Sequence, residues 1–172
     1  MSFVDKLVEP MALSGVDGII SASAGLLGFT ATNLYDTQVI ISLLIMLISD
    51  GLSMSASYFN MKQVEPNDEE KEQNNQMIDG ELIWRSLMNL VAFVVFGAIP
   101  IIVYMATIQS SSRKVSSGLA FVASLIGMSI LGIIQFIIKG RPVFIYSTPT
   151  VGAIAGIIIF FIAPLIEKSV TT

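Results

Sequence analysis

Five stretches of about 20 mostly apolar residues constrain this chain more than any other feature of its sequence. A helix of that length crosses a hydrocarbon core about 30 Å thick. Apolar residues make up 53% of the chain and charged residues 13%, whereas a soluble domain contains about 25% charged residues. The sequence therefore predicts an all-α, polytopic membrane protein with a single membrane domain over residues 1–172. The five predicted transmembrane helices cover residues 11–31, 39–59, 86–108, 118–138 and 145–166.

Two polar segments flank these predicted helices. Residues 3–11 place apolar side chains at helical spacing, which predicts either a short interfacial helix or a frayed terminus. Residues 61–85 are predicted to form a short acidic cytoplasmic segment between the second and third helices. Glu65, Glu69 and Glu72 share one face if this segment is helical, and such a row can collect divalent cations. The alternative interpretation is a solvated, self-repelling loop.

The distribution of Lys and Arg predicts the orientation in the membrane. With a cytoplasmic N-terminus, six of the nine basic residues lie in cytoplasmic segments and three lie on the other side. This excess favours a cytoplasmic N-terminus and a C-terminus outside the cytoplasm. The three residues on the other side are Arg113, Lys114 and Lys168. The sequence does not distinguish a vacuolar-type membrane from another endomembrane or the plasma membrane.

The chain lacks the residues that several classes of function require. Cys and His are both absent, which removes disulfide frameworks, Cys/His zinc sites, Cys nucleophiles and histidine proton relays. No motif supplies a nucleophile with its base, so we do not expect an enzyme. The net charge of −4 favours no nucleic-acid partner. We expect no bound cofactor.

Two carboxylates lie within predicted transmembrane helices. Asp17 lies in the first helix and Asp50 in the second half of the second helix. A carboxylate at such a depth usually faces a bundle interior or an aqueous cavity and marks an ion or proton path. The alternative is that each is an end-of-helix residue that reaches water.

Each aspartate is part of a polar stripe along its helix. Asp17 and Ser21 are four residues apart, and oxygen- and sulfur-bearing residues follow Asp50 at steps of three and four. These two stripes would form an oxygen-rich cation site if they met. Oxygen ligands with a nearby thioether suit Fe²⁺ or Mn²⁺ better than Ca²⁺ or Mg²⁺. For Met54 alone, ordinary packing is the alternative. The second stripe consists of Asp50, Ser53, Met54, Ser57 and Met61.

Four short motifs follow one another along the chain: VDGIIS at 16–21, DGLSMS at 50–55, GAIP at 97–100 and KGRP at 139–142. In this order, and with an acidic segment after the second motif, they resemble the vacuolar iron transporter family. The resemblance extends from about residue 14 to residue 165 and includes the small-residue-rich last helix.

This resemblance implies a fold, a cargo and roles for particular residues. It implies five transmembrane helices and a homodimer whose transport path lies between the subunits in the lipid bilayer. It also implies that Fe²⁺ and/or Mn²⁺ leaves the cytoplasm in exchange for protons, with the metal as cargo. Asp17 and Met54 would then be ligands on the metal path. Because a poorly hydrated carboxylate tends to hold a proton, Asp17 is also the predicted proton-coupling residue. The acidic segment would correspond to a cytoplasmic metal-collecting domain.

Two features depart from the family's pattern. The family usually has a glutamate shortly after the methionine, and Ser57-Tyr58-Phe59 occupies that place here. The acidic segment has room for one brief helix, with Glu65 and Glu69 as candidate ligands, rather than for a domain of the family's size. Two alternatives therefore stay open: a transport-deficient membrane scaffold or interaction protein with the same fold, and an uncoupled cation channel.

Overall fold

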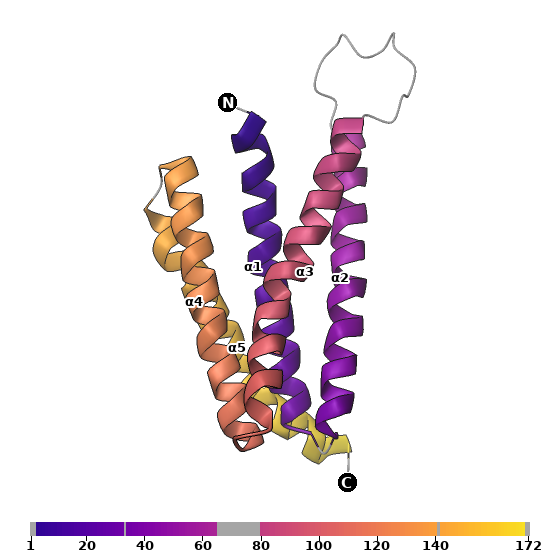
Figure 1. Ribbon diagram of the computed structural model, residues 1–172, viewed down its shortest axis with the longest axis vertical. Coiled ribbons are helices and arrows are strands. Elements are labelled where there is room, and N and C mark those ends of the chain that lie inside the picture. Colours follow the sequence, from indigo (N-terminus) through magenta and orange to yellow (C-terminus); the bar gives the residue numbers. More distant parts are fainter. Residues whose placement is uncertain (1–2, 33, 65–79, 141, 171–172) are drawn as a thin grey trace.

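A computed structural model of the chain describes residues 3–32, 34–64, 80–140 and 142–170, and all regular secondary structure in these ranges is helical. Five helices alternate in direction, so the two termini lie at opposite ends of the bundle (Figure 1). The helices are α1 (Phe3–Thr30), α2 (Asp36–Val64), α3 (Gly80–Ile108), α4 (Arg113–Lys139) and α5 (Val143–Val170).

Four of the helices are long and apolar enough to cross a membrane. In α5 the apolar part within the described residues is shorter and covers Val143–Ile159. The prediction of an all-helical chain with several helices able to cross a membrane is therefore confirmed for the described residues. The four membrane-length stretches are Pro10–Thr30, Asp36–Asn60, Leu82–Ile108 and Arg113–Ile138.

The helices extend beyond their apolar stretches at the end of the bundle that holds the N-terminus. α1 is one continuous helix that passes through Pro10, so no separate interfacial helix precedes it. α2 continues to Val64 and α3 begins at Gly80, so both ends of the predicted acidic segment are helical. Glu65, Glu69 and Glu72 lie outside the described residues.

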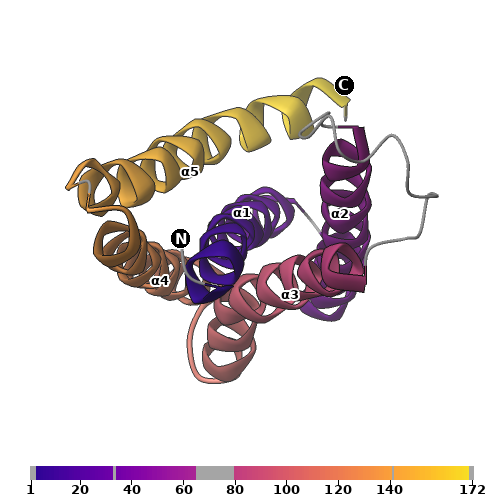
Figure 2. The same cartoon turned by 90° about the horizontal axis from the view of Figure 1, so that it is seen from above.

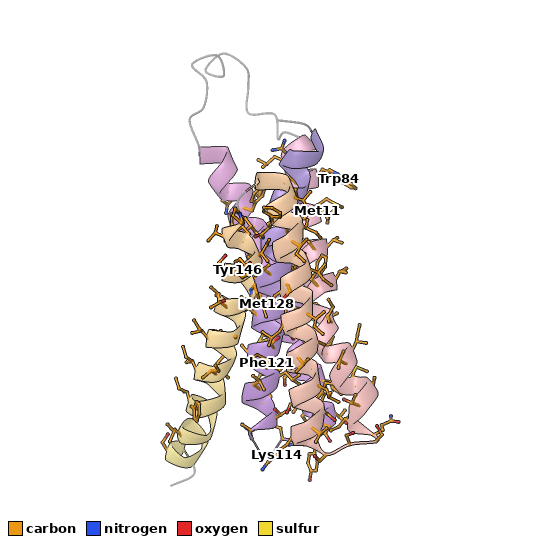
Figure 3. The ribbon with its side chains drawn as sticks, turned by 90° about the vertical axis from the view of Figure 1, so that its left-hand side faces the viewer. Met11, Trp84, Lys114, Phe121, Met128 and Tyr146 are labelled. Carbon is orange, nitrogen blue, oxygen red and sulfur yellow. The ribbon has the colours of Figure 1, made fainter. Side chains whose placement is uncertain are left out.

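α1 is the central helix of the bundle. It contacts each of the other four helices, and Figure 2 shows it enclosed by them. Among the described residues, α2 contacts α1 and α3, whereas α5 contacts α1 and α4. α5 lies beside α4 near Tyr146 and diverges from it toward the C-terminus (Figure 3). The side of α1 between α2 and α5 is therefore the least covered by helices of this chain.

Small residues allow α1 and α3 to pack with their backbones in contact. A Cβ added at Gly18 would overlap the Phe93 carbonyl oxygen, and one added at Gly97 would lie 2.8 Å from the Gly18 carbonyl oxygen. Close approach of this kind is how helices associate in lipid, where the hydrophobic effect does not drive helices together. The α1–α3 crossing therefore depends on glycine in both helices.

Buried side chains form two clusters around α1. The apolar core lies among α1, α2, α3 and α4, and a second cluster joins α1 to α4. A buried hydrogen bond of 2.6 Å between the Ser23 and Ser124 hydroxyl groups also connects α1 to α4. The buried members of the apolar core are Ala22, Leu26, Val39, Leu43, Leu47, Phe93, Ile101, Tyr104 and Ala120.

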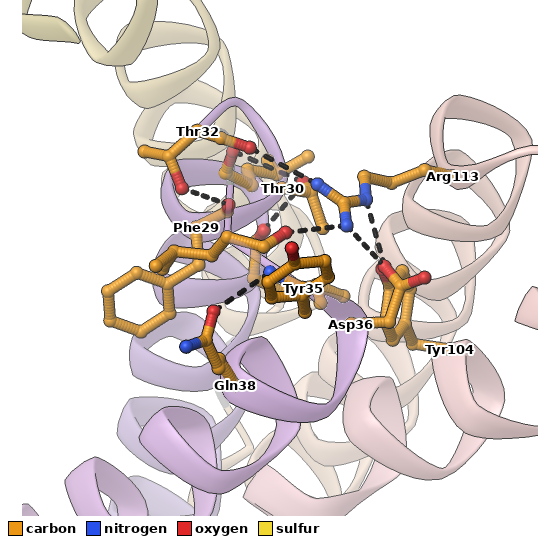
Figure 4. Close-up of polar contacts among 11 residues, drawn as sticks. Phe29, Thr30, Thr32, Tyr35, Asp36, Gln38, Tyr104 and Arg113 are labelled. Carbon is orange, nitrogen blue, oxygen red and sulfur yellow. Dashed lines mark hydrogen bonds and ion pairs between the residues drawn. The ribbon is translucent and has the colours of Figure 1, made fainter.

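A polar cluster joins the helix ends at the opposite end from the N-terminus, and we call it the far-end cluster (Figure 4). Asp36 Oδ1 accepts hydrogen bonds from Tyr104 Oη at 2.7 Å and from Arg113 Nε at 2.8 Å. The Arg113 guanidinium also donates to the carbonyl oxygens of Thr32 and Leu34, at 3.1 and 2.6 Å. The far-end cluster thus connects the α1–α2 loop, the end of α3 and the start of α4.

Candidate functional site

The two predicted polar stripes line one cleft of about 280 Å³, apart from Met61, whose side chain lies outside the described residues. α1 contributes two residues to its wall, α2 contributes four, and α3 contributes one. The sequence predicted each stripe separately, and the structure brings the two together. The lining residues are Asp17, Ser21, Asp50, Ser53, Met54, Ser57 and Phe93.

α1 presents its polar side to the cleft and buries the opposite side. Asp17 and Ser21 line the cleft one turn apart, and the Asp17 side chain is exposed in the single chain. The neighbouring residues Gly18, Ile19 and Ala22 are buried against other helices. The close α1–α3 contact at Gly18 therefore fixes the position of the adjacent Asp17.

α2 lines the cleft with residues at helical spacing. Asp50, Ser53 and Ser57 are exposed, whereas Met54 is half-buried and also packs against the apolar core. Met54 thus has a packing role, as the plainer interpretation of the sequence expected, and its side chain also borders the cleft. The thioether and the two aspartates are the three cleft groups that we predicted as metal ligands.

The two carboxylates lie well inside their apolar stretches. Asp17 follows Pro10 by seven residues, and Asp50 precedes Asn60 by ten. At 1.5 Å per residue these positions are roughly 10 and 15 Å from the ends of the stretches. Both carboxylates therefore lie roughly 10 Å or more from the ends of these stretches.

The cleft contains two carboxyl groups and no basic side chain among its lining residues. Asp17 and Asp50 are its two ionisable groups within the described part of the chain. Nowhere among the described residues do three or more His, Cys, Asp or Glu side chains come together in a group that could hold a metal ion. Two carboxylates, a thioether and hydroxyl groups are therefore the donors that the described residues provide.

A second groove of about 430 Å³ lies between α2 and α3 and differs in chemistry. It is mostly apolar, and none of the described residues that line it is charged. Its polar contact is a hydrogen bond of 2.6 Å from the Ser55 hydroxyl group to the Ser86 carbonyl oxygen. This groove offers no cation ligand comparable with the two aspartates of the cleft. Its lining residues are Leu52, Ser55, Ala56, Phe59, Asn60, Ile83, Ser86 and Leu87.

Sequence reasoning missed Phe93. Phe93 lines the cleft from α3, and its exposed fraction is 2%. An aromatic residue in an apolar helix carries no local signal that distinguishes it from ordinary core residues. Only the packing of three helices gives Phe93 its place beside both aspartates.

Comparisons with protein-family models, with curated proteins and with solved structures found no match for this chain.

Proposed function

We propose that this protein transports a divalent metal ion across a membrane, with the cleft as its cation site. The observation that carries this proposal is the meeting of Asp17 and Asp50 in one cleft, far from the ends of their apolar stretches. Ionised carboxylates at membrane depth are costly unless a cation, a proton or water compensates them. A divalent cation would neutralise both carboxylates at once.

The donor set supports Fe²⁺ or Mn²⁺ as the cargo. Carboxylate and hydroxyl oxygens bind Mn²⁺ and Fe²⁺, and a thioether favours the softer ions over Ca²⁺ and Mg²⁺. The cleft offers both kinds of donor, because Met54 borders it beside Asp50 and Ser53. The resemblance to vacuolar iron transporters points to the same ions and to export from the cytoplasm.

Exchange for protons follows from the chemistry of a shielded carboxylic acid. Such a group is more stable with its proton than as an unpaired anion, and a bound cation displaces that proton. Asp17 is our candidate for this coupling role. Reprotonation from the other side of the membrane would then weaken metal binding and release the ion.

The proposal includes all five helices as membrane crossings and a cytoplasmic N-terminus. α5 contains 28 residues, which corresponds to about 42 Å of helix and exceeds a hydrocarbon core of about 30 Å. The acidic segment with Glu65, Glu69 and Glu72 would collect cations at the cytoplasmic entrance.

A homodimer is the assembly that suits an exposed polar cleft. In the single chain Asp17 and Asp50 are exposed, and only 22% of the most apolar part of α2 is buried, against 44% for α1. Lipid cannot solvate these carboxylates, so protein or cavity water must cover them. A second copy placed against this side would enclose the two clefts together.

The experiment that tests this function is metal flux into proteoliposomes with and without an imposed pH gradient. We expect wild-type protein to take up Fe²⁺ or Mn²⁺ faster with the gradient. Asp17→Asn, which keeps the shape of the side chain, should abolish the effect of the gradient. Asp50→Asn should weaken uptake, and Asp17→Glu should retain part of it because the carboxylate is kept.

The outcomes separate the proposal from its two rivals. Flux that is independent of the gradient and insensitive to Asp17→Asn would indicate an uncoupled channel. No flux from folded wild-type protein, judged by a single species in size-exclusion chromatography, would indicate a membrane scaffold and would refute transport.

A further inference from the structure

Phe93 lies at the boundary between the cleft and the apolar core. Phe93 lines the cleft, and its side chain is a buried member of the apolar core. Ala22 on α1, Leu47 on α2 and Ile101 on α3 belong to that core as well. Along its own helix, each of these core residues lies farther from the N-terminal end of the bundle than the cleft residue does (Figure 1). The cleft residues compared are Asp17 on α1, Asp50 on α2 and Phe93 on α3.

The two aspartates are each followed by a glycine that packs against Phe93. A Cβ at Gly18 would overlap the Phe93 carbonyl oxygen, and a Cβ at Gly51 would lie 3.2 Å from Phe93 Cδ1. Phe93 therefore sits between the two Asp-Gly pairs, with its backbone against α1 and its ring against α2.

We propose that the Phe93 ring is the barrier that separates the cleft from the far end of the bundle. A hydrated ion that leaves the cleft in that direction first meets the ring and then the apolar core. Apolar constrictions of this kind stop ions by excluding water. This inference rests on the proposed function for its cargo, but the barrier can be measured without transport.

Thiol labelling tests the barrier directly, because the chain contains no cysteine. Ala22→Cys places a single small thiol one turn beyond Gly18, at a fully buried position of the apolar core. A small cationic methanethiosulfonate reagent is added to the protein in liposomes. We expect slow labelling with Phe93 present and labelling at least about tenfold faster after Phe93→Ala, because water then reaches the thiol.

Phe96→Ala is the matched control for this truncation. Phe96 is on the same helix and half-buried, but it packs against the second cluster and does not line the cleft. Labelling should stay slow in this variant and in Phe93→Leu, which keeps an apolar side chain in place. Phe93→Val replaces Phe93→Ala if the latter does not give a single folded species, and it should also label faster than wild type.

Two results would overturn the barrier. One is labelling that does not change after Phe93→Ala or Phe93→Val, and the other is an equal increase after Phe96→Ala. In the flux assay, Phe93→Ala should add metal leakage that needs no pH gradient. Absence of flux in wild-type protein would refute transport, whereas the labelling result would still decide the role of Phe93.

Discussion

Gly18 lies at the crossing of α1 and α3, next to the aspartate that we assign to proton coupling. Its missing side chain lets α1 rest on the backbone of Phe93, and a backbone atom cannot move aside as a flexible side chain can. The position of Asp17 thus depends on the size of the next residue as well as on its own side chain.

Gly18→Ala should therefore destabilise the protein and displace Asp17. We expect a loss of about 3 kcal/mol in the free energy of unfolding, since overpacking costs about 1–3 kcal/mol and the contact here is backbone. Thermal unfolding followed by circular dichroism in detergent measures this loss. Gly28→Ala is the control on the same helix, because nothing lies within 4 Å of its added Cβ. Equal stability of the two variants would contradict the close crossing.

Met54 should influence which metal is transported more than whether the protein folds. Met54→Leu keeps the apolar volume and removes the sulfur. We therefore expect the half-saturating Fe²⁺ concentration to rise roughly tenfold, which corresponds to a loss of about 1.4 kcal/mol in binding free energy. Met46→Leu is the control, because Met46 also packs against the apolar core from α2 but does not line the cleft. The same affinity in both variants would assign Met54 to packing alone.

Much of the cleft was predictable at the scale of single residues. Asp50, Ser53 and Met54 share one helical face because of their spacing, which is a local property of the sequence. Their meeting with Asp17 was not predictable, since no local signal states which helix faces which. Phe93 was missed for the same reason.

At the scale of helices, the far-end cluster gives Arg113 a structural role. Its guanidinium is shared between the Asp36 carboxylate and two carbonyl oxygens of the α1–α2 loop. A fork of several donors makes such a set of contacts possible, and a lysine ammonium group would not reproduce it. This role explains why a basic residue lies at the end of the bundle opposite the N-terminus, where the distribution of Lys and Arg predicted few basic residues.

Arg113→Ala should destabilise the bundle by about 1–2 kcal/mol, after allowance for the partial exposure of the ion pair. The neighbouring residue supplies the control, because Lys114 is exposed and Lys114→Ala removes the same charge. Thermal unfolding at low and high salt compares the two variants. A loss that is equally large for Lys114→Ala would mean that net charge matters at this end rather than the far-end cluster.

Helix ends were harder to predict than helix centres. The apolar pattern placed the centres correctly, but α1 continues through Pro10 and α2 continues past Asn60 to Val64. Polar residues can prolong a helix beyond the membrane without any change in apolar pattern. Gly140 is a clear local signal for the end of α4, since it has a φ of 64° and its N–H donates a hydrogen bond of 2.7 Å to the Phe136 carbonyl oxygen.

At the scale of the whole molecule, the topology makes a simple prediction about the termini. They lie at opposite ends of the bundle, so an odd number of crossings should place them on opposite sides of the membrane (Figure 1). Reporter fusions should be active in the cytoplasm at the N-terminus and outside the cytoplasm at the C-terminus. Two cytoplasmic termini would show that α5 does not cross.

The sequence by itself determined the class of this protein and the character of each helix. Length and apolar content of a segment, and the spacing of residues along it, are properties of neighbouring residues, so they can be read without a structure. The tertiary structure alone decided that α1 is central, that Asp17 and Asp50 line one cleft, and that Phe93 lines it from α3. These features depend on contacts between helices, such as the packing of Gly18 on α1 against the backbone of Phe93 on α3. Such contacts join residues that are far apart in the chain, so the local sequence does not reveal them.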